Sequence, residues 1–392
     1  MRGVRVLPNP NVSSAWNLGP RGRDPLTFHR RLPGYEPTPL IDAPGLAKAL
    51  GVGRVWVKDE SYRLGLPAFK ILGASWAVYR ALEERSESGI GAWDDLEELR
   101  ERIEPLRPLA LAAATDGNHG RAVARLAKLL GLEARIFVPA DMVAPRVEAI
   151  ASEGAAVTVV DGGYDAAVTR SAEEAGGRCL VISDTAWPGY EDVPLWVIEG
   201  YSTIMWEVKD ELARRGEAGP DLVVAQIGVG AFAAAVVAHF RARRADVRIL
   251  GVEPNGAACM LASVEAGRIV SLSALRPSIM AGLNCGTPST VAWPIVSKGT
   301  DVFVSIEDEW ARRAMRSLAH VGLVSGETGG AGLAGLLALV DDAAHEHTRR
   351  LLGMGEETTV LLFNCEGPTD PDAYTRIVAD EGASSARRNR TR

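Results

Sequence analysis

The stretch Pro67-Ala68-Phe69-Lys70-Ile71-Leu72-Gly73-Ala74 places a single lysine among apolar and small residues. A lysine normally keeps its ammonium group in water, so this setting is unusual. Burial would lower the pKa of Lys70, because desolvation disfavours the charged form, and a neutral amine can attack an aldehyde. The stretch therefore predicts a reactive amine. A lysine whose head group snorkels out of a buried helix is the simpler alternative.

Short β-rich runs alternate with Ala-rich helical runs over most of the 392 residues. This alternation predicts an α/β fold of two lobes, with parallel sheets flanked by helices. A charged insertion at 84–108 is expected to carry a helix at 94–103, and the tail 384–392 is expected to be disordered. The expected strands are 54–58, 109–113, 134–138, 156–160, 222–227, 248–253 and 358–363, and the clearest helices are 121–130 and 231–242.

Composition narrows the classes of function. The chain is 47% hydrophobic, which suits two domains with ample cores, and its net charge of −7 makes nucleic acid an unexpected partner. No apolar stretch is long enough to cross a bilayer, so we expect a soluble cytoplasmic protein. Four cysteines without a Cys-x-x-Cys pair make no disulfide framework; Cys259 and Cys285 are expected to be thiols there, with a local disulfide between them as the alternative. Six scattered histidines offer no zinc spacing, so no metal is expected.

Two turns follow expected strands and open expected helices, where free backbone N–H groups suit an anion. The first is Thr115-Asp116-Gly117-Asn118-His119-Gly120, although an ordinary capped turn would have the same pattern. The second is Gly228-Val229-Gly230-Ala231-Phe232-Ala233, whose glycines let the backbone approach a phosphate. With Glu253 at the end of the next strand, the second turn also fits a dinucleotide fingerprint, so a nicotinamide enzyme is an alternative.

These segments, together with Pro37-Thr38-Pro39-Leu40 and Val57-Lys58-Asp59-Glu60-Ser61, resemble the signature of the tryptophan synthase β (fold type II) family of pyridoxal-phosphate enzymes. The resemblance implies a two-domain fold with pyridoxal 5'-phosphate in the cleft between the domains. It implies a large cofactor-binding domain at 1–109 and 201–383 and a small substrate-loop domain at 110–200. A non-catalytic protein that only binds the cofactor is an alternative, which the full set of segments disfavours.

The same resemblance assigns roles to individual residues. Lys70 becomes the Schiff-base lysine, and Asn118 the partner of the cofactor's phenolic oxygen. Residues Gly228, Val229, Gly230, Ala231 and Phe232 hold the phosphate, and Thr115, Asp116, His119 and Asp184 bind the substrate. Asn364 and Cys365 lie where the family places a small polar residue against the pyridine nitrogen, a neutral partner that favours elimination at the β-carbon. For Cys365, a buried core thiol is the simpler reading.

Two carboxylates distinguish this chain within the family. Most relatives have Ser, Thr or Ala in place of Asp116, and Asp184 lies in a connection after an expected strand. A carboxylate beside a bound amino acid can hold a second ammonium group or act as a general acid or base. A turn or helix cap is the simpler role for either residue. Lys70, Asp116 and Asp184 are thus the predicted catalytic residues.

With the segments 29–40 and 279–286, the two acids narrow the resemblance to family members that eliminate ammonia from 2,3-diaminopropionate. The implied reaction is D- or L-2,3-diaminopropionate plus water giving pyruvate and two ammonia. That makes the chain a carbon–nitrogen lyase of amino-acid catabolism with a small amino-acid substrate, expected as a homodimer. A serine/threonine dehydratase, which shares the cofactor segments but needs no second carboxylate, is the alternative.

Overall fold

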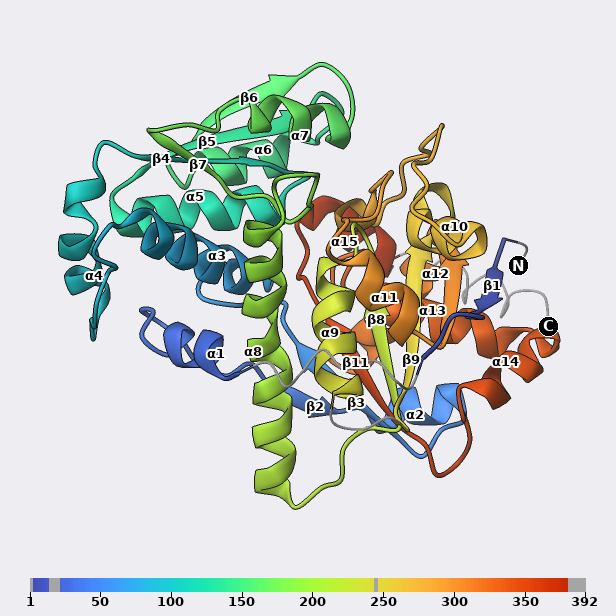
Figure 1. Ribbon diagram of the computed structural model, residues 1–392. Helices are drawn as coiled ribbons and strands as arrows, with labels where there is room; N and C mark the ends of the chain where they lie inside the picture. The colour runs from blue at the N-terminus through green and yellow to red at the C-terminus, as the bar shows by residue number, and fades with distance from the viewer. Residues whose placement is uncertain (1–2, 14–21, 243–245, 380–392) are drawn as a thin grey trace.

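The computed structural model describes residues 3–13, 22–242 and 246–379, so the expected disordered tail at 384–392 lies outside the described residues. The chain forms two separate sheets, one of seven strands and one of four (Figure 1). Helices cover the faces of both sheets, as the strand–helix alternation predicts. The predicted α/β class is confirmed.

The larger sheet is parallel except at its edges, where β1 and β2 pair antiparallel with their neighbours. Its inner strands are buried on both faces, which is why they read as nearly continuous runs of Val, Leu and Ile. In sheet order the strands are β1 (Arg5–Pro8), β10 (Val302–Ile306), β9 (Arg248–Pro254), β8 (Leu222–Gln226), β11 (Thr359–Asn364), β3 (Arg54–Asp59) and β2 (Leu40–Asp42).

The smaller sheet is entirely parallel and is built from residues 110–181. The helix α5 (Asn118–Leu130) packs on its two central strands. The helices α6 (Ala144–Ala151) and α7 (Tyr164–Ala172) complete this part of the chain. The division into domains at 110 and 200 stays a prediction. In sheet order the strands are β6 (Ala156–Val160), β5 (Glu133–Pro139), β4 (Ala110–Ala114) and β7 (Cys179–Val181).

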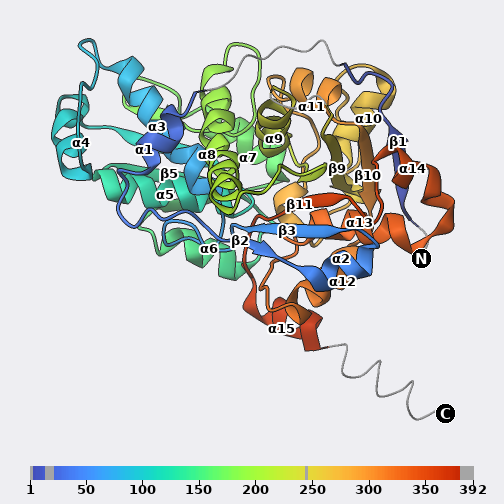
Figure 2. The same cartoon turned by 90° about the horizontal axis from the view of Figure 1, so that it is seen from below.

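Helices lie on both faces of the larger sheet (Figure 2). Adjacent residues of one strand point to opposite faces, so Val223 packs in one buried cluster with α9 and Val224 in another with α13. None of the helices among the described residues is long and apolar enough to cross a membrane. The helices of these layers are α2 (Pro44–Leu50), α9 (Ala231–Arg241), α10 (Cys259–Ala266), α11 (Trp293–Gly299), α12 (Asp308–His320), α13 (Ala331–Asp341), α14 (Glu346–Leu351) and α15 (Pro371–Ala379).

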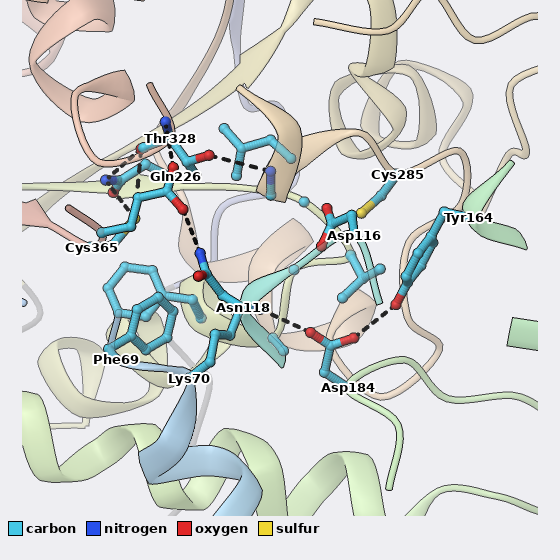
Figure 3. Close-up of a pocket in the computed structure, with 18 residues that line it drawn as sticks. Phe69, Lys70, Asp116, Asn118, Tyr164, Asp184, Gln226, Cys285, Thr328 and Cys365 are labelled. Carbon is cyan, nitrogen blue, oxygen red and sulfur yellow. Dashed lines mark hydrogen bonds and ion pairs between the residues drawn. The ribbon is translucent and has the colours of Figure 1, made fainter. Parts of the chain in front are cut away.

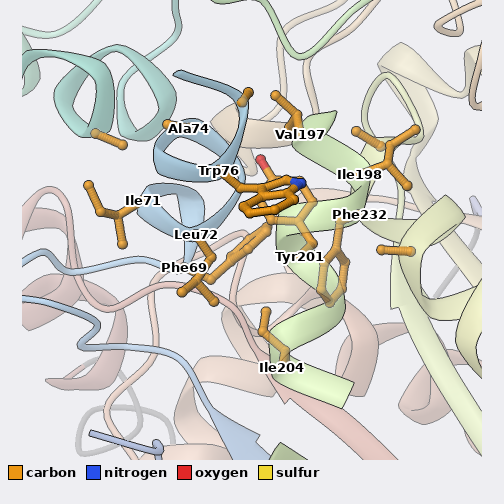
Figure 4. Close-up of a cluster of buried hydrophobic side chains, with 14 of the residues drawn as sticks. Phe69, Ile71, Leu72, Ala74, Trp76, Val197, Ile198, Tyr201, Ile204 and Phe232 are labelled. Atoms are coloured by element: carbon orange, nitrogen blue, oxygen red, sulfur yellow. The ribbon is translucent and has the colours of Figure 1, made fainter. Parts of the chain in front are cut away.

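Two closely packed helices fix the position of Lys70. Lys70 begins α3 (Lys70–Arg85), which packs along α8 (Asp192–Arg215). A Cβ atom at Gly73 would lie 2.5 Å from Tyr201 Cε1, and one at Gly200 would lie 2.4 Å from the Leu72 carbonyl oxygen, so only glycine allows this approach. Tyr201, Phe69 and other apolar side chains fill the contact (Figure 4). The short helices α1 (Asp24–His29) and α4 (Leu96–Arg102), the latter within the predicted 94–103 helix, complete this region.

Candidate active site

A cavity lies at the carboxyl ends of strands from both sheets (Figure 3). Turns after β4, β7, β8 and β11 supply its walls, and α3 enters it with its first residue. Ligands of parallel α/β sheets characteristically bind at this edge. Of the residues predicted from sequence, the cavity is lined by Lys70, Asp116, Asn118, Asp184, Gly228, Val229, Gly230, Ala231, Phe232 and Cys365.

Lys70 is held by an ion pair in this cavity. Its Nζ atom lies 2.9 Å from Asp184 Oδ2, and 20% of its side chain is exposed. Burial alone, the largest single effect, would lower the pKa of Lys70, but Asp184, Tyr201 and Asp116 together outweigh burial and raise it well above its usual value. The predicted lowering of the pKa of Lys70 is therefore wrong, because nearby negative groups, first among them Asp184, outweigh the desolvation.

Asp184 binds two polar side chains of the cavity, Lys70 and Tyr164. Besides the ion pair with Lys70, its Oδ1 atom accepts a hydrogen bond from Tyr164 Oη at 3.0 Å. Burial alone would raise the pKa of Asp184, but Lys70, His119 and these hydrogen bonds lower it well below its usual range. Burial and the same carboxylate raise the pKa of Tyr164, so its hydroxyl keeps its proton and donates. Asp184 is thus an ionised group with both oxygens occupied.

Asp116 has the opposite electrostatic character. It lies in the turn after β4, and burial, helped by the negative charge of Asp184, raises its pKa to about 6. Lys70 and Arg146 oppose this shift without cancelling it. The environments therefore separate the pKa values of two neighbouring carboxylates, an arrangement that lets one stay charged while the other exchanges a proton near neutral pH.

The glycine turn after β8 leaves an open helix N-terminus in the cavity. Gly230 precedes α9 with a φ of +100°, and no side chain of the described residues caps this end of the helix. A Cβ atom at Gly230 would lie 2.8 Å from Met260 Cε and 3.1 Å from Ala292 Cβ. Exposed N–H groups and the helix dipole favour a phosphate dianion at such an end.

The dinucleotide alternative for this turn is contradicted by the position of Glu253. Its side chain is fully buried, and its two oxygens accept the backbone N–H groups of Met260 and Leu261 at 2.8 Å. A dinucleotide enzyme would need this carboxylate for a ribose hydroxyl. Glu253 instead caps α10, a role that its spacing from the glycine turn did not reveal.

Replacing Gly230 with alanine should weaken the binding of pyridoxal phosphate and destabilise the protein. A left-handed conformation and two close contacts make the new Cβ atom strained, at a cost of about 1–3 kcal/mol. Chemical denaturation with and without the cofactor would measure both effects. Gly355→Ala is the matched control, because that glycine has no left-handed φ and nothing within 4 Å of an added Cβ. Equal stability and cofactor affinity for the two variants would contradict the role of this turn.

Cys365, rather than Asn364, lines the cavity at the end of β11. The Cys365 Sγ atom lies 3.5 Å from Gln226 Nε2 and 3.6 Å from the Thr328 carbonyl oxygen. Asn364 points away, where its Nδ2 atom donates to Asp59 Oδ1 and the Val324 carbonyl, both at 2.9 Å. Successive side chains of a strand alternate in direction, which explains why only one of the two sequence candidates reaches the cavity.

Thr115 and His119 do not line the cavity. They stabilise the turn after β4 by hydrogen bonds to backbone groups. The Thr115 hydroxyl accepts the Gly117 N–H at 2.8 Å, and His119 Nε2 lies 2.8 Å from the Ile182 carbonyl oxygen. Between them, Asn118 faces the cavity, and its Nδ2 atom donates to Glu366 Oε2. Glu366 also accepts the Thr328 N–H at 3.0 Å, so it joins the turn after β11 to the turn after β4 and to the segment that precedes α13.

Several lining residues were not selected from the sequence. Gly282 and Cys285 lie inside the segment 279–286, which was recognised, but nothing in the pattern indicated which residues line the cavity. Tyr164 begins a helix and follows no signature at all. The described residues contain no group of three side chains that could hold a metal ion. The lining residues missed are Phe69, Tyr164, Gln226, Gly282, Leu283, Cys285, Thr328 and Glu366.

Comparisons with known proteins agree on one family. Residues 31–352 match the family model described as "Pyridoxal-phosphate dependent enzyme". A diaminopropionate ammonia-lyase from Salmonella typhimurium is 36% identical over 374 residues, which cover 91% of each chain. The crystal structure of the Escherichia coli diaminopropionate ammonia-lyase with an aminoacrylate–pyridoxal-phosphate azomethine intermediate covers 97% of each chain, with a TM-score of 0.87 and 32% identity. A structure of that enzyme with D-serine has a TM-score of 0.88 and 31% identity.

Proposed function

The chain belongs to the family of pyridoxal-phosphate-dependent enzymes, and we propose that it is a diaminopropionate ammonia-lyase. It converts 2,3-diaminopropionate and water into pyruvate and two ammonia. The observation that carries the proposal is the pair of carboxylates beside Lys70, one ion-paired at 2.9 Å and one with a pKa of about 6. It is supported by the diaminopropionate ammonia-lyase from Salmonella typhimurium, which is 36% identical over 91% of the chain.

The cavity fits the cofactor that the family uses. The uncapped N-terminus of α9 suits its phosphate, and Gly230 leaves room where a Cβ atom would clash. Lys70 supplies the primary amine, with Asn118 and Cys365 lining the space for the ring. Pyridoxal phosphate supplies, when bound, an electron sink for the electron pair left at the α-carbon of an amino acid.

Different side chains take the α-proton and bind the leaving β-ammonium group. Lys70 Nζ and a carboxylate oxygen of Asp116 are the two groups able to take the α-proton. Asp184 stays ionised and holds the β-ammonium by a charge-assisted hydrogen bond, while Tyr164 fixes its other oxygen. Because Asp184 holds the β-amine as its ammonium, the leaving group already carries the proton with which it departs, and no second acid is needed.

Release of the 2-oxo acid by the purified protein with added pyridoxal phosphate tests this proposal, as pyruvate from 2,3-diaminopropionate or L-serine and as 2-oxobutyrate from L-threonine. We expect the kcat/KM for 2,3-diaminopropionate to exceed those for L-serine and L-threonine by at least about 100-fold. A hydroxyl substrate would leave the charged Asp184 without its ammonium partner, and a site built for a polar group discriminates strongly against substrates that lack it. Preference for serine or threonine would instead identify a dehydratase and leave the cofactor family unchanged.

We propose further that the protein is a cytoplasmic homodimer of amino-acid catabolism. All four cysteines, among them Cys259 and Cys285, are free and buried thiols, as a reducing compartment favours. We also propose a small domain at 110–200, around the four-stranded sheet, and a large domain at 1–109 and 201–383.

A further inference from the structure

A second and larger cavity adjoins the first. It has a volume of about 490 Å³, and Asp116 and Tyr164 line both cavities. Its lining includes residues that follow β5, among them Arg146 of α6, and also Glu327 and the start of α15. The larger cavity therefore meets the cavity that contains Asp184 at these two residues, Asp116 and Tyr164.

Glu327 is a buried carboxylate to which the described residues give no ion-pair partner. Only 5% of the residue is exposed, and its hydrogen bond within the described part of the chain is to its own backbone N–H. Burial raises the pKa of Glu327, with Glu366 and Asp370 adding to the effect and Arg146 opposing it. A buried carboxylate left this way is costly, so its position beside a cavity points to a cationic group that binds there.

Arg146 presents the opposite charge to the same cavity. Its Nε atom donates to Thr369 Oγ1 at 3.1 Å, and the described residues place no carboxylate within ion-pair distance of its guanidinium. Arg146 and Glu327 thus line one cavity without contacting each other. A guanidinium and a carboxylate held apart in this way complement the carboxylate and the ammonium of an amino acid.

We propose that this larger cavity is an outer substrate subsite, in which Glu327 binds an ammonium group and Arg146 the carboxylate of an incoming diamino acid. The inference rests on the proposed function and describes where the substrate of that active site would first bind. Asp116, Asp141, Glu327 and Asp370 line the cavity against one arginine. Their excess negative charge attracts a substrate with two ammonium groups more strongly than a substrate with one.

Glu327→Gln tests the outer subsite in the holoenzyme, with L-2,3-diaminopropionate as the probe. The variant removes the charge but keeps the shape, so capture of the substrate should suffer and the later chemistry should not. We expect kcat/KM to fall about tenfold or more while kcat stays within about twofold. Asp372→Asn, an exposed carboxylate of α15 that does not line the cavity, is the matched control and should change neither value.

Equal losses of kcat and kcat/KM in Glu327→Gln, or no loss in either, would overturn the outer subsite. Salt provides a second measurement that needs no variant. The kcat/KM of the wild-type enzyme should fall as salt rises from about 0.05 M to about 0.5 M, because a solvent-filled charged cavity is screened. A kcat/KM that does not change with salt would also overturn it. Failure of the proposed function would appear separately, as wild-type protein that releases no pyruvate from diaminopropionate.

Discussion

Replacing Lys70 with alanine is expected to abolish turnover, with a loss of about 10³-fold or more, because one group that acts in several steps cannot be replaced by its neighbours. The variant should also lack the visible absorption band of lysine-linked pyridoxal phosphate. It should be less stable without cofactor by about 3 kcal/mol, since removal of Lys70 leaves the buried Asp184 carboxylate without its cation. Pyruvate release, absorption spectra and denaturation curves measure the three effects.

Lys70→Arg separates the chemical role of the amine from its charge. Arginine keeps a cation beside Asp184 but has no amine that can attack an aldehyde at neutral pH. This variant should be as inactive as Lys70→Ala and lack the same absorption band, yet lose less stability. Turnover by either variant at more than a few hundredths of the wild-type rate would contradict the assignment of Lys70.

The order of strands and helices was accessible from the sequence because the inner strands of both sheets are parallel. These inner strands are largely buried and give nearly continuous apolar runs, so β8 and β9 were placed within one residue. The expected strand at 109–113 is β4, shifted by one residue. Local patterns of this kind depend on the burial of the strand itself and not on distant partners.

Electrostatics of the site could not be read from the sequence in the same way. The apolar neighbours of Lys70 suggested a lowered pKa, but Asp184, far along the chain, raises it. Tyr164 binds Asp184 across two different elements, and no spacing in the sequence relates them. Sequence patterns revealed the turns that meet at the cavity, whereas the direction of each side chain and its charged partners depend on tertiary contacts.

Replacing Asp116 with asparagine should remove turnover of D-2,3-diaminopropionate by about 10²–10⁴-fold, the usual contribution of a general base, and keep most turnover of the L isomer. Lys70 begins α3 and Asp116 follows β4, so the two bases enter the cavity from different elements (Figure 3). Each would then take the α-proton of one isomer. Pyruvate release from the separate isomers measures the effect, and equal losses for both would contradict a division between two bases.

The pH dependence of the wild-type enzyme provides an independent check on Asp116. Its pKa is raised to about 6, so the carboxylate is largely ionised above that pH and protonated below it. A base must be ionised to accept a proton, and kcat/KM for the D isomer should therefore fall as the pH decreases through about 6. An unshifted carboxyl would lose activity only near pH 4. In Asp116→Asn this acid limb should be absent from the residual activity toward the D isomer. An unchanged limb near pH 6 in the variant would assign the titration to another group and remove Asp116 from the role of base.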